Sequence, residues 1–321
     1  MNPPSLGPGG EFDRIRGIWQ RLGSRVQGAG DDCAIIEAGT ERLALSTDLS
    51  IENVHFKLGW LTPEEIGWRA TAAALSDLAA VAATPMGVLV SLGVSSEWPE
   101  EHVAMLMDGA GKAVEAVGAV VWGGDLTRND KLVVNVTVIG RLDGEPVLRS
   151  GAQAGDDLWV TGTLGGPGAA LAAWQRAEEP EATARERFVH PVPRVAEAKW
   201  LRDRGAKAMI DLSDGLAADV AHIAAASGVC CTIDADLVPT AGRDGWTVGR
   251  LDGWTAAEAL TSGEEYELLV AMPPLSTSLA QEFQSRFGIP LTKVGDVTAG
   301  SGSRIIQNGN PIEVRGAFRH F

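Results

Sequence analysis

The sequence predicts an α/β (α+β) protein that is built from two domains. Short aliphatic runs alternate with alanine-rich helical stretches in both halves of the chain, and this alternation is typical of the class. The length of 321 residues is sufficient for two domains of roughly 100–200 residues each. The segment Asp143-Gly144-Glu145-Pro146 has the composition of a turn between the halves. We therefore expect an N-terminal domain over residues 11–145 and a C-terminal domain over residues 146–321.

The N-terminal half begins with a Pro/Gly-rich lead-in over residues 1–10, which we expect to be disordered. The elements that follow are expected as strands over 42–47, 119–122 and 132–142, and as helices over 63–83 and 99–117. Thr62 is suited to cap the first of these helices, and Pro63 fits its first turn.

The C-terminal half contains a similar alternation. Residues 157–161 and 208–210 are expected as strands, and residues 214–226 as a helix that ends before Gly228. The acidic segment 178–186 is interpreted as a solvated loop or an exposed helix face.

Composition excludes several classes of function. The net charge of −15 argues against a general basic field for nucleic acid or anionic membrane, and no apolar run approaches the roughly 18 residues of a membrane span. The cysteines Cys33, Cys230 and Cys231 lack zinc-site spacing, so we interpret them as reduced core thiols. No signal-peptide pattern begins the chain, and we expect a cytoplasmic protein.

Acidic residues gather where strand-like runs end or beside glycine turns. These clusters are Gly30-Asp31-Asp32, Ser46-Thr47-Asp48, Leu75-Ser76-Asp77, Gly123-Gly124-Asp125 and Asp211-Leu212-Ser213-Asp214-Gly215. Loops at strand ends often present functional groups, and their small neighbours leave room for a metal ion or a phosphate. Carboxylates that converge without cations would repel one another, so the clusters predict a site for several Mg²⁺ ions, bound nucleotide, or both.

Each cluster also has a purely structural interpretation. Ser213 or Asp214 alone would serve as a helix N-cap, and Asp31 or Asp125 beside glycine would serve as a turn residue. Asp77 is harder to explain in this way, because it lies in an almost uncharged Ala/Leu helix where an ionised side chain is costly unless paired. The Gly-Lys pair at Lys112 does not complete a P-loop, since Ala113 stands where a Ser or Thr would hold magnesium.

The motifs, taken in order, resemble the thiamine-monophosphate kinase family. The segments that carry the resemblance are Gly30 to Ala34, Ser46 to Asp48 with His55-Phe56, Leu75 to Ala80, Gly123 to Arg128, Arg149 to Ala152, Ile210 to Leu216 and Ser262 to Leu268. This family belongs to a superfamily that includes aminoimidazole ribonucleotide synthase and selenophosphate synthetase. The resemblance extends over nearly the whole chain.

The resemblance implies a two-domain aminoimidazole ribonucleotide synthase-like fold, in which each domain is a mixed sheet with helices packed on it. It implies a homodimer formed through N-terminal strands, and a reaction of ATP with thiamine monophosphate that gives ADP and thiamine diphosphate. The implied magnesium ligands are Asp32, Ser46, Thr47, Asp48, Asp77, Asp125, Asp211 and Asp214. The implied ATP contacts are Gly124, Asp125, Arg149 and Ser213, and the implied contacts to the thiamine substrate are His55, Glu264 and Phe318.

Three positions depart from the family pattern. Glu265 stands where Asp is usual, Leu126 replaces a Thr, and Asn129 replaces a Gly. Two other hypotheses remain open: another ATP-dependent synthase of the same superfamily, and a non-catalytic protein that binds nucleotide or metal. Release of ADP with a phosphorylated acceptor would separate the kinase from the non-catalytic protein.

Overall fold

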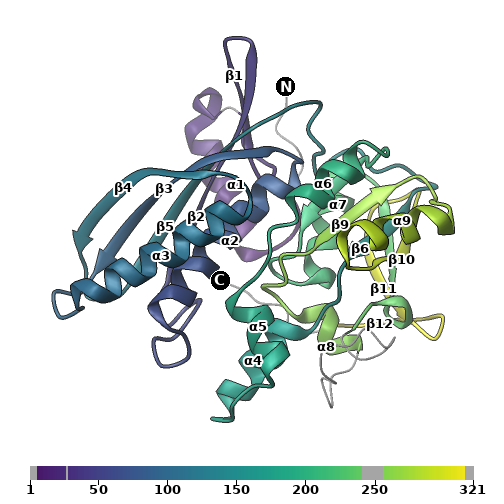
Figure 1. The fold of residues 1–321 in the computed structure, drawn as a ribbon. Helices are drawn as coiled ribbons and strands as arrows, with labels where there is room; N and C mark the ends of the chain where they lie inside the picture. The colour runs from purple at the N-terminus through teal and green to yellow at the C-terminus, as the bar shows by residue number, and fades with distance from the viewer. Residues whose placement is uncertain (1–5, 27, 241–255, 315–321) are drawn as a thin grey trace.

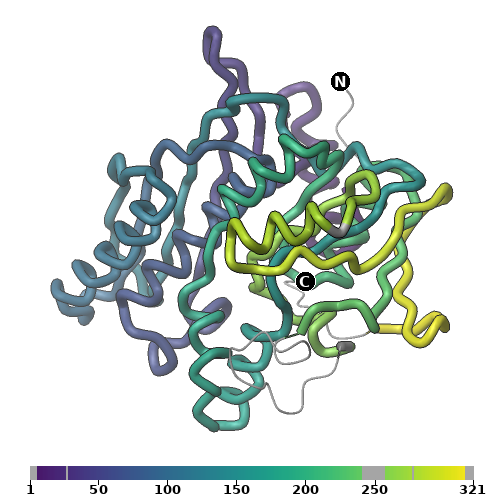
Figure 2. The backbone as a smooth tube through the Cα atoms, turned by 45° about the vertical axis from the view of Figure 1, so that its right-hand side comes forward, coloured from purple at the N-terminus to yellow at the C-terminus, as the bar shows by residue number. Residues whose placement is uncertain are grey.

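The structure is a computed structural model that describes residues 6–26, 28–240 and 256–314. The N-terminal half, purple to teal, and the C-terminal half, green to yellow, lie side by side in both views (Figures 1 and 2). Within the described part of the chain, no helix is long and apolar enough to cross a membrane.

The N-terminal half contains a mixed five-stranded sheet among the described residues, in the spatial order β1-β2-β5-β3-β4. Its strands are β1 (Ala34–Ala38), β2 (Glu41–Ile51), β3 (Thr84–Val94), β4 (Val120–Arg128) and β5 (Val133–Arg141). Only the pairing of β3 with β4 is parallel within this sheet as described. The hairpin of β1 and β2 projects at the top of Figure 1, and β4 forms the opposite edge.

The C-terminal half contains a mixed seven-stranded sheet among the described residues, in the order β12-β11-β8-β10-β6-β9-β7. Its strands are β6 (Asp157–Thr161), β7 (Ala208–Asp211), β8 (Cys230–Asp234), β9 (Leu268–Met272), β10 (Leu291–Thr298), β11 (Gly302–Gln307) and β12 (Asn310–Ile312). The fold class predicted from the sequence, two domains that each combine a mixed sheet with helices, is confirmed.

Helices pack against both sheets and between the halves. The α-helices are α1 (Gly10–Leu22), α2 (Pro63–Ala80), α3 (Glu100–Ala116), α4 (Gly166–Gln175), α5 (Ala182–Val189), α6 (Val195–Arg202), α7 (Leu216–Ser227), α8 (Ala256–Thr261) and α9 (Thr277–Phe287). Helices α2 and α3 lie next to each other across one face of the five-stranded sheet (Figure 1).

Helix α2 is the central element of the molecule. It contacts β2 and β5 of its own sheet, and also α5, α6 and the edge strand β7 of the C-terminal half. Its many alanines allow this close approach on several sides, because a helix that is apolar nearly all round can be buried nearly all round. Thr62 caps the helix as predicted, in a reciprocal capping box with Glu65.

The hydrophobic cores extend beyond the domain boundary that we expect near residue 146. Trp174 of α4 and Phe188 of α5 belong to the same core cluster as the residues of α2 and β5. Trp174 stacks on Trp60 with 5.1 Å between ring centroids, and its edge meets Phe188 at 5.2 Å. The two halves therefore share a core as well as an interface.

Most of the elements named from the sequence are present. The strands expected at 42–47, 119–122, 132–142, 157–161 and 208–210 and the helices expected at 63–83 and 99–117 are confirmed with shifted ends. The helix expected at 214–226 spans Leu216–Ser227, and Gly228 follows it in the left-handed conformation of a C-cap. In segment 178–186, Pro180 and Ala184 are buried, Thr183 and Arg185 are half-buried and the other residues are exposed, and α5 begins within it.

All three cysteines are free and buried, as predicted. The lead-in over residues 1–10 stays a prediction. Of its residues the structure describes 6–10, where Gly7 is buried against His222 and the Arg16 guanidinium donates to the carbonyl oxygens of Leu6 and Gly7.

Candidate active site

Three carboxylates from separate segments converge at the contact between the two halves. Asp32 lies in the turn before β1, Asp77 in α2, and Asp211 at the end of β7, and one oxygen of each lies within 4.8 Å of the others. The packing of α2 against β7 brings the last two together. We call this group the carboxylate trio.

The electrostatics of the trio favour a bound cation. Burial raises the pKa of Asp211 to about 7, and the charge of Asp32 adds to the effect. Burial also raises the pKa of Asp77 well above its usual range, with further contributions from Asp211 and Asp32. Oxygen donors of this kind are the ligands that Mg²⁺ prefers, so the residues present fit that ion.

Strand β2 presents its predicted residues on two different faces. The hydroxyl of Ser46 donates to Asp77 Oδ2 at 2.5 Å, so Ser46 faces α2 and the trio. Because side chains alternate along a strand, Asp48 shares this face and Thr47 does not. Thr47 Oγ1 lies 3.1 Å from Thr137 Oγ1, on the face of the sheet opposite α2. The Thr47 side chain is therefore separate from the trio.

Arg149 supplies a positive charge beside the trio. Its Nε and Nη2 donate to the two carboxylate oxygens of Asp32, at 3.1 and 2.5 Å. Its backbone N–H donates to Asp31, where burial, followed by the charge of Asp32, raises the pKa to about 7. The guanidinium partly neutralises the negative charge of the cluster.

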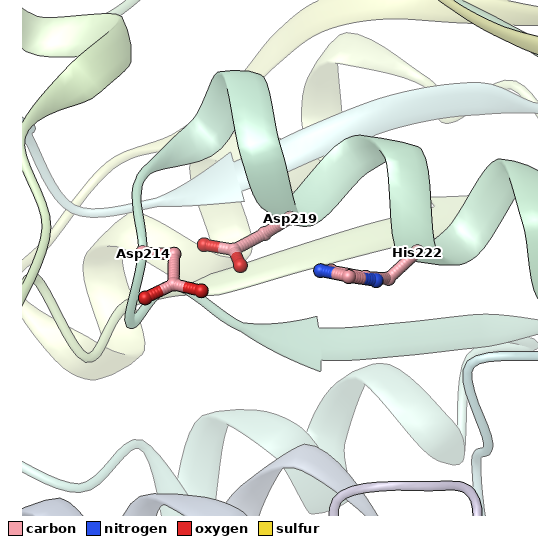
Figure 3. Close-up of side chains that lie close together, drawn as sticks. All are labelled: Asp214, Asp219 and His222. Carbon is pink, nitrogen blue, oxygen red and sulfur yellow. The ribbon is translucent and has the colours of Figure 1, made fainter. Parts of the chain in front are cut away.

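Asp214 belongs to a second group of metal-ligand type. Figure 3 shows Asp214 facing Asp219, with the His222 ring directed at Asp219 from one turn further along α7. The helix N-cap is Gly215, whose N–H donates to Asp219 Oδ2 at 3.0 Å, so the capping interpretation of Ser213 or Asp214 is wrong. Sequence reasoning missed Asp219 and His222, although their i, i+3 spacing places them on one helix face.

Two of the three residues expected to contact the thiamine substrate, His55 and Glu264, are close enough to Asp48 to affect its charge. Burial raises the pKa of Asp48; the negative charge of Glu264 adds to this, and His55 and Arg69 oppose it. The His55 Nδ1 accepts the backbone N–H of Ile51 at 3.0 Å, which leaves Nε2 as the protonated nitrogen of the neutral ring. His55 from the N-terminal half and Glu264 from the C-terminal half therefore both act on the charge of one carboxylate.

Ser213 connects the trio to the Glu264 loop. Its backbone carbonyl accepts the N–H of Glu264 at 2.7 Å, and its side chain is exposed. Glu265, the departure from the family pattern, is buried and accepts from Ser262 Oγ and from the N–H of Gly165, both at 2.5 Å. The longer side chain of Glu265 therefore holds the Glu264 loop on its buried side.

Gly124 and Asp125 lie on β4, at the far edge of the first sheet. Asp48 pairs with Val136, Val136 with Val90, and Val90 with Gly124 on neighbouring strands. Three strand spacings, about 14 Å, therefore separate Asp48 from Gly124. A Cβ on Gly124 would meet the carbonyl oxygen of Val90 at 1.6 Å, which explains the glycine without a ligand. Asp125 pairs with Ser91, on the face that carries Thr47.

Two of the departures from the family pattern lie at strand β4 and the turn after it. Leu126 is 60% exposed on β4, and Asn129 forms the turn after that strand through its bond to the carbonyl of Val94. Phe318 lies outside the described residues.

Comparison with known proteins gives consistent results along the chain. Residues 30–142 match the family described as "AIR synthase related protein, N-terminal domain", and residues 153–308 match its C-terminal domain. A thiamine-monophosphate kinase of Mycobacterium tuberculosis is 38% identical over 274 residues, which cover 83% of this chain and 81% of that protein. A thiamine-monophosphate kinase of Bacillus subtilis is 33% identical over 328 residues, covering 97% and 99%.

A solved structure agrees with these relatives. It is described as "AaThiL complexed with AMPPCP and TMP", has a TM-score of 0.83 and 29% sequence identity, and the match covers 97% of each chain. Sequence, domain order and fold thus agree over almost the full length. The chain belongs to the thiamine-monophosphate kinase family.

Proposed function

We propose that this chain transfers the γ-phosphoryl group of ATP to thiamine monophosphate, which gives ADP and thiamine diphosphate. The observation that carries the proposal is the convergence of Asp32, Asp77 and Asp211 at the contact between the two halves. The names of the relatives support the same reaction, as does the solved structure, whose description gives AMPPCP and TMP as its ligands.

The chemistry of the acceptor agrees with the groups around the trio. A phosphate monoester has a second pKa near 6, so it is already a dianion at neutral pH and needs no general base. The enzyme must instead neutralise two anions that repel each other and hold them in line. A site rich in carboxylates suits this task only with divalent cations, which change the sign of the local charge.

Magnesium ions are the cofactor that we propose. Asp32, Asp77 and Asp211 would hold them together with Ser46 and Asp48, and Asp214 would add a ligand at the start of α7. Bound there, the ions would neutralise charge on the transferring phosphoryl group. The Arg149 guanidinium would donate two parallel hydrogen bonds to an ATP phosphate oxygen pair, and Ser213 would contact the nucleotide through its exposed hydroxyl.

The acceptor would lie on the other side of Asp48. His55 would donate from Nε2 and Glu264 would accept from the heterocycle, and both residues would orient the acceptor phosphate toward the trio. Phe318 stays a proposed stacking partner for the thiamine rings.

We also propose that two copies form a homodimer through the open face of the first sheet. That face and its edge expose large apolar side chains, including Leu49, Leu89, Trp122 and Leu126, and such patches are typical of interaction sites. A second copy would explain how Gly124 and Asp125 contribute, because each lies far from the trio of its own chain. Asp125 of one copy would then meet Thr47 of the other, because both side chains lie on the open face. Three free thiols agree with a reducing compartment, and we propose the cytoplasm.

A coupled assay of ADP release tests the proposal. The protein is mixed with ATP, Mg²⁺ and one acceptor from a panel of phosphate monoesters, and the products are identified by mass. We expect ADP and thiamine diphosphate in equal amounts with thiamine monophosphate, and far less ADP with the other acceptors. Binding of ATP without acceptor-dependent ADP release would contradict the proposal and favour a non-catalytic protein.

A further inference from the structure

The loop that carries Glu264 is held in an unfavourable backbone conformation. Glu264 has a φ of 65° and Tyr266 a φ of 51°, both in the left-handed region that non-glycine residues seldom occupy. The N–H groups of Glu264 and Tyr266 bond the carbonyl oxygens of Ser213 and Leu212, at 2.7 and 2.9 Å. Strain of this kind persists only where the surroundings fix it, and it often marks a functional site.

One oxygen of the Glu264 carboxylate is held from two sides. Its Oε2 accepts from Arg69 Nη2 and, at 2.6 Å, from the hydroxyl of Tyr266. Among the described residues, no donor bonds Oε1, and the Glu264 side chain is 27% exposed. The carboxylate thus has a fixed inner oxygen and an outer oxygen that is left to accept.

Arg69 is itself fixed and has no freedom to follow a ligand. It is 4% exposed, its Nη1 donates to the carbonyl of Phe188, and its guanidinium lies 3.7 Å from the centre of the Phe188 ring. Arg69 and Asp77 both lie on α2, whereas Glu264 comes from the C-terminal half. The ion pair of Arg69 with Glu264 therefore fixes the outer oxygen of Glu264 relative to Asp77.

The chemistry around the outer oxygen defines what it would bind. Asp48 is near enough to Glu264 for the two charges to affect each other, so an anionic or acceptor-only group would be repelled here. A group with an N–H donor would pair with Oε1. Its binding affinity would be highest if this oxygen is already oriented, because no free energy is then needed to order it. The amino group on the pyrimidine ring of thiamine is such a donor.

We propose that Arg69 and Tyr266 are positioning residues that orient Glu264 Oε1 toward the amino group of the acceptor's heterocycle, and so select acceptors that carry this donor. The inference rests on the proposed kinase function and adds to it the residues that set acceptor specificity. Neither residue touches the reacting phosphates; both act through Glu264.

A second ion pair provides a matched control. Arg185 donates to the two carboxylate oxygens of Glu65, at 2.7 and 3.0 Å, and this pair also joins the C-terminal half to α2. If Arg69 only clamped the two halves together, loss of either pair would have the same kind of effect. Because Arg69 contacts Glu264, we expect loss of the Arg69–Glu264 pair to change acceptor specificity and loss of the Arg185–Glu65 pair to leave it unchanged.

The test compares Tyr266→Phe, Arg69→Lys and the control Arg185→Gln. For each variant, kcat and both KM values are measured with thiamine monophosphate and with the analogue whose pyrimidine amino group is replaced by oxygen. Tyr266→Phe keeps the ring and removes only the hydroxyl, so it tests the proposal even if Arg69→Lys folds poorly. Thermal unfolding of each variant accounts for changes in stability.

We expect Tyr266→Phe to raise the KM for thiamine monophosphate roughly tenfold, the cost of one hydrogen bond to a charged group, with the KM for ATP within about twofold. Preference for the amino substrate over the oxygen analogue should fall by a similar factor. Arg185→Gln should leave that preference unchanged. Equal preference in Tyr266→Phe and the unsubstituted protein, or a parallel rise of both KM values, would overturn the inference while the kinase function stands. An unsubstituted protein that does not phosphorylate thiamine monophosphate would overturn both.

Discussion

The buried Asp211 carboxyl makes the stability of the protein depend on pH. Its pKa of about 7 lies above the ordinary value of 3.8, so the folded protein without metal prefers the protonated form. The stability that this group contributes is fully present below pH 3.8 and is lost as the pH rises through about 7. A cation at the trio would favour the ionised form and so oppose both causes of the shift, which are burial first and the charge of Asp32 second.

The metal-free protein should therefore become less stable between pH 5 and pH 8, and Asp211→Asn should remove part of this dependence. Thermal unfolding in the presence of a chelator measures the effect, and the gap between the variant and the unsubstituted protein should widen as the pH rises. Asp130→Asn, an exposed change in the turn after β4, is the control and should give a constant gap. Parallel curves for Asp211→Asn would refute the electrostatic account of the trio.

Residue types predicted part of the site but not its pairings. Asp77 stood out because an isolated charge in an alanine-rich helix needs a partner. The bonds of Arg149 to Asp32 and of Arg69 to Glu264 depend on the approach of distant segments, and no local pattern encodes that approach. Asp219 and His222 were missed because their spacing is equally typical of an ordinary helix face.

At the level of elements, the contact between α2 and α3 requires glycine on both helices. A Cβ on Gly67 would lie 1.8 Å from the carbonyl oxygen of Leu106, and one on Gly109 would lie 1.9 Å from that of Glu64. The two backbones touch at these points, and α2 is thereby held in place against the sheet that carries Ser46 and Asp48.

Gly67→Ala should destabilise the protein by roughly 1–3 kcal/mol, because the added methyl group forces the two helices apart. The midpoint of thermal unfolding should fall by a few degrees. Gly111→Ala is the matched control on α3, where a Cβ would meet no atom within 4 Å, and it should be neutral or slightly stabilising. Equal effects of the two substitutions would show that the close helix contact is not limiting.

The sequence pattern predicted the ends of helices but did not predict strand β3. Thr62, Pro63 and Gly228 act at helix ends in ways that propensity explains. Strand β3 was not predicted, since Pro85 and three glycines or serines interrupt its pattern, yet it lies between β5 and β4 in the sheet. Its burial comes from tertiary packing, which overrides propensity.

Across the molecule as a whole, the proposed ligand Asp125 and the carboxylate trio lie on separate parts of one chain. The trio lies where the halves meet, and Asp125 lies on the edge strand β4 with the open face of the sheet between them. The alternation of strands and helices predicted two domains, but it could not predict that Trp174 and Phe188 would join the core of the first half.

A mixed dimer tests whether Asp125 acts on the site of a second copy. Asp77→Asn and Asp125→Asn are each expected to be inactive alone. If Asp125 acts between copies, co-expression should restore about a quarter of the normal specific activity, because half of the dimers are mixed and each has one intact site. No recovery, together with a dimeric mass in solution, would place Asp125 in the site of its own chain; a monomeric mass would refute the homodimer.

We propose that the carboxylate trio holds the magnesium that phosphoryl transfer requires. The most direct measurement is the rate of thiamine diphosphate formation as a function of Mg²⁺ concentration, for the unsubstituted protein and for Asp77→Asn. We expect the folded variant to lose roughly 100-fold or more in rate and to need a higher Mg²⁺ concentration for the remaining activity. The same rate and the same Mg²⁺ dependence in both proteins would contradict it.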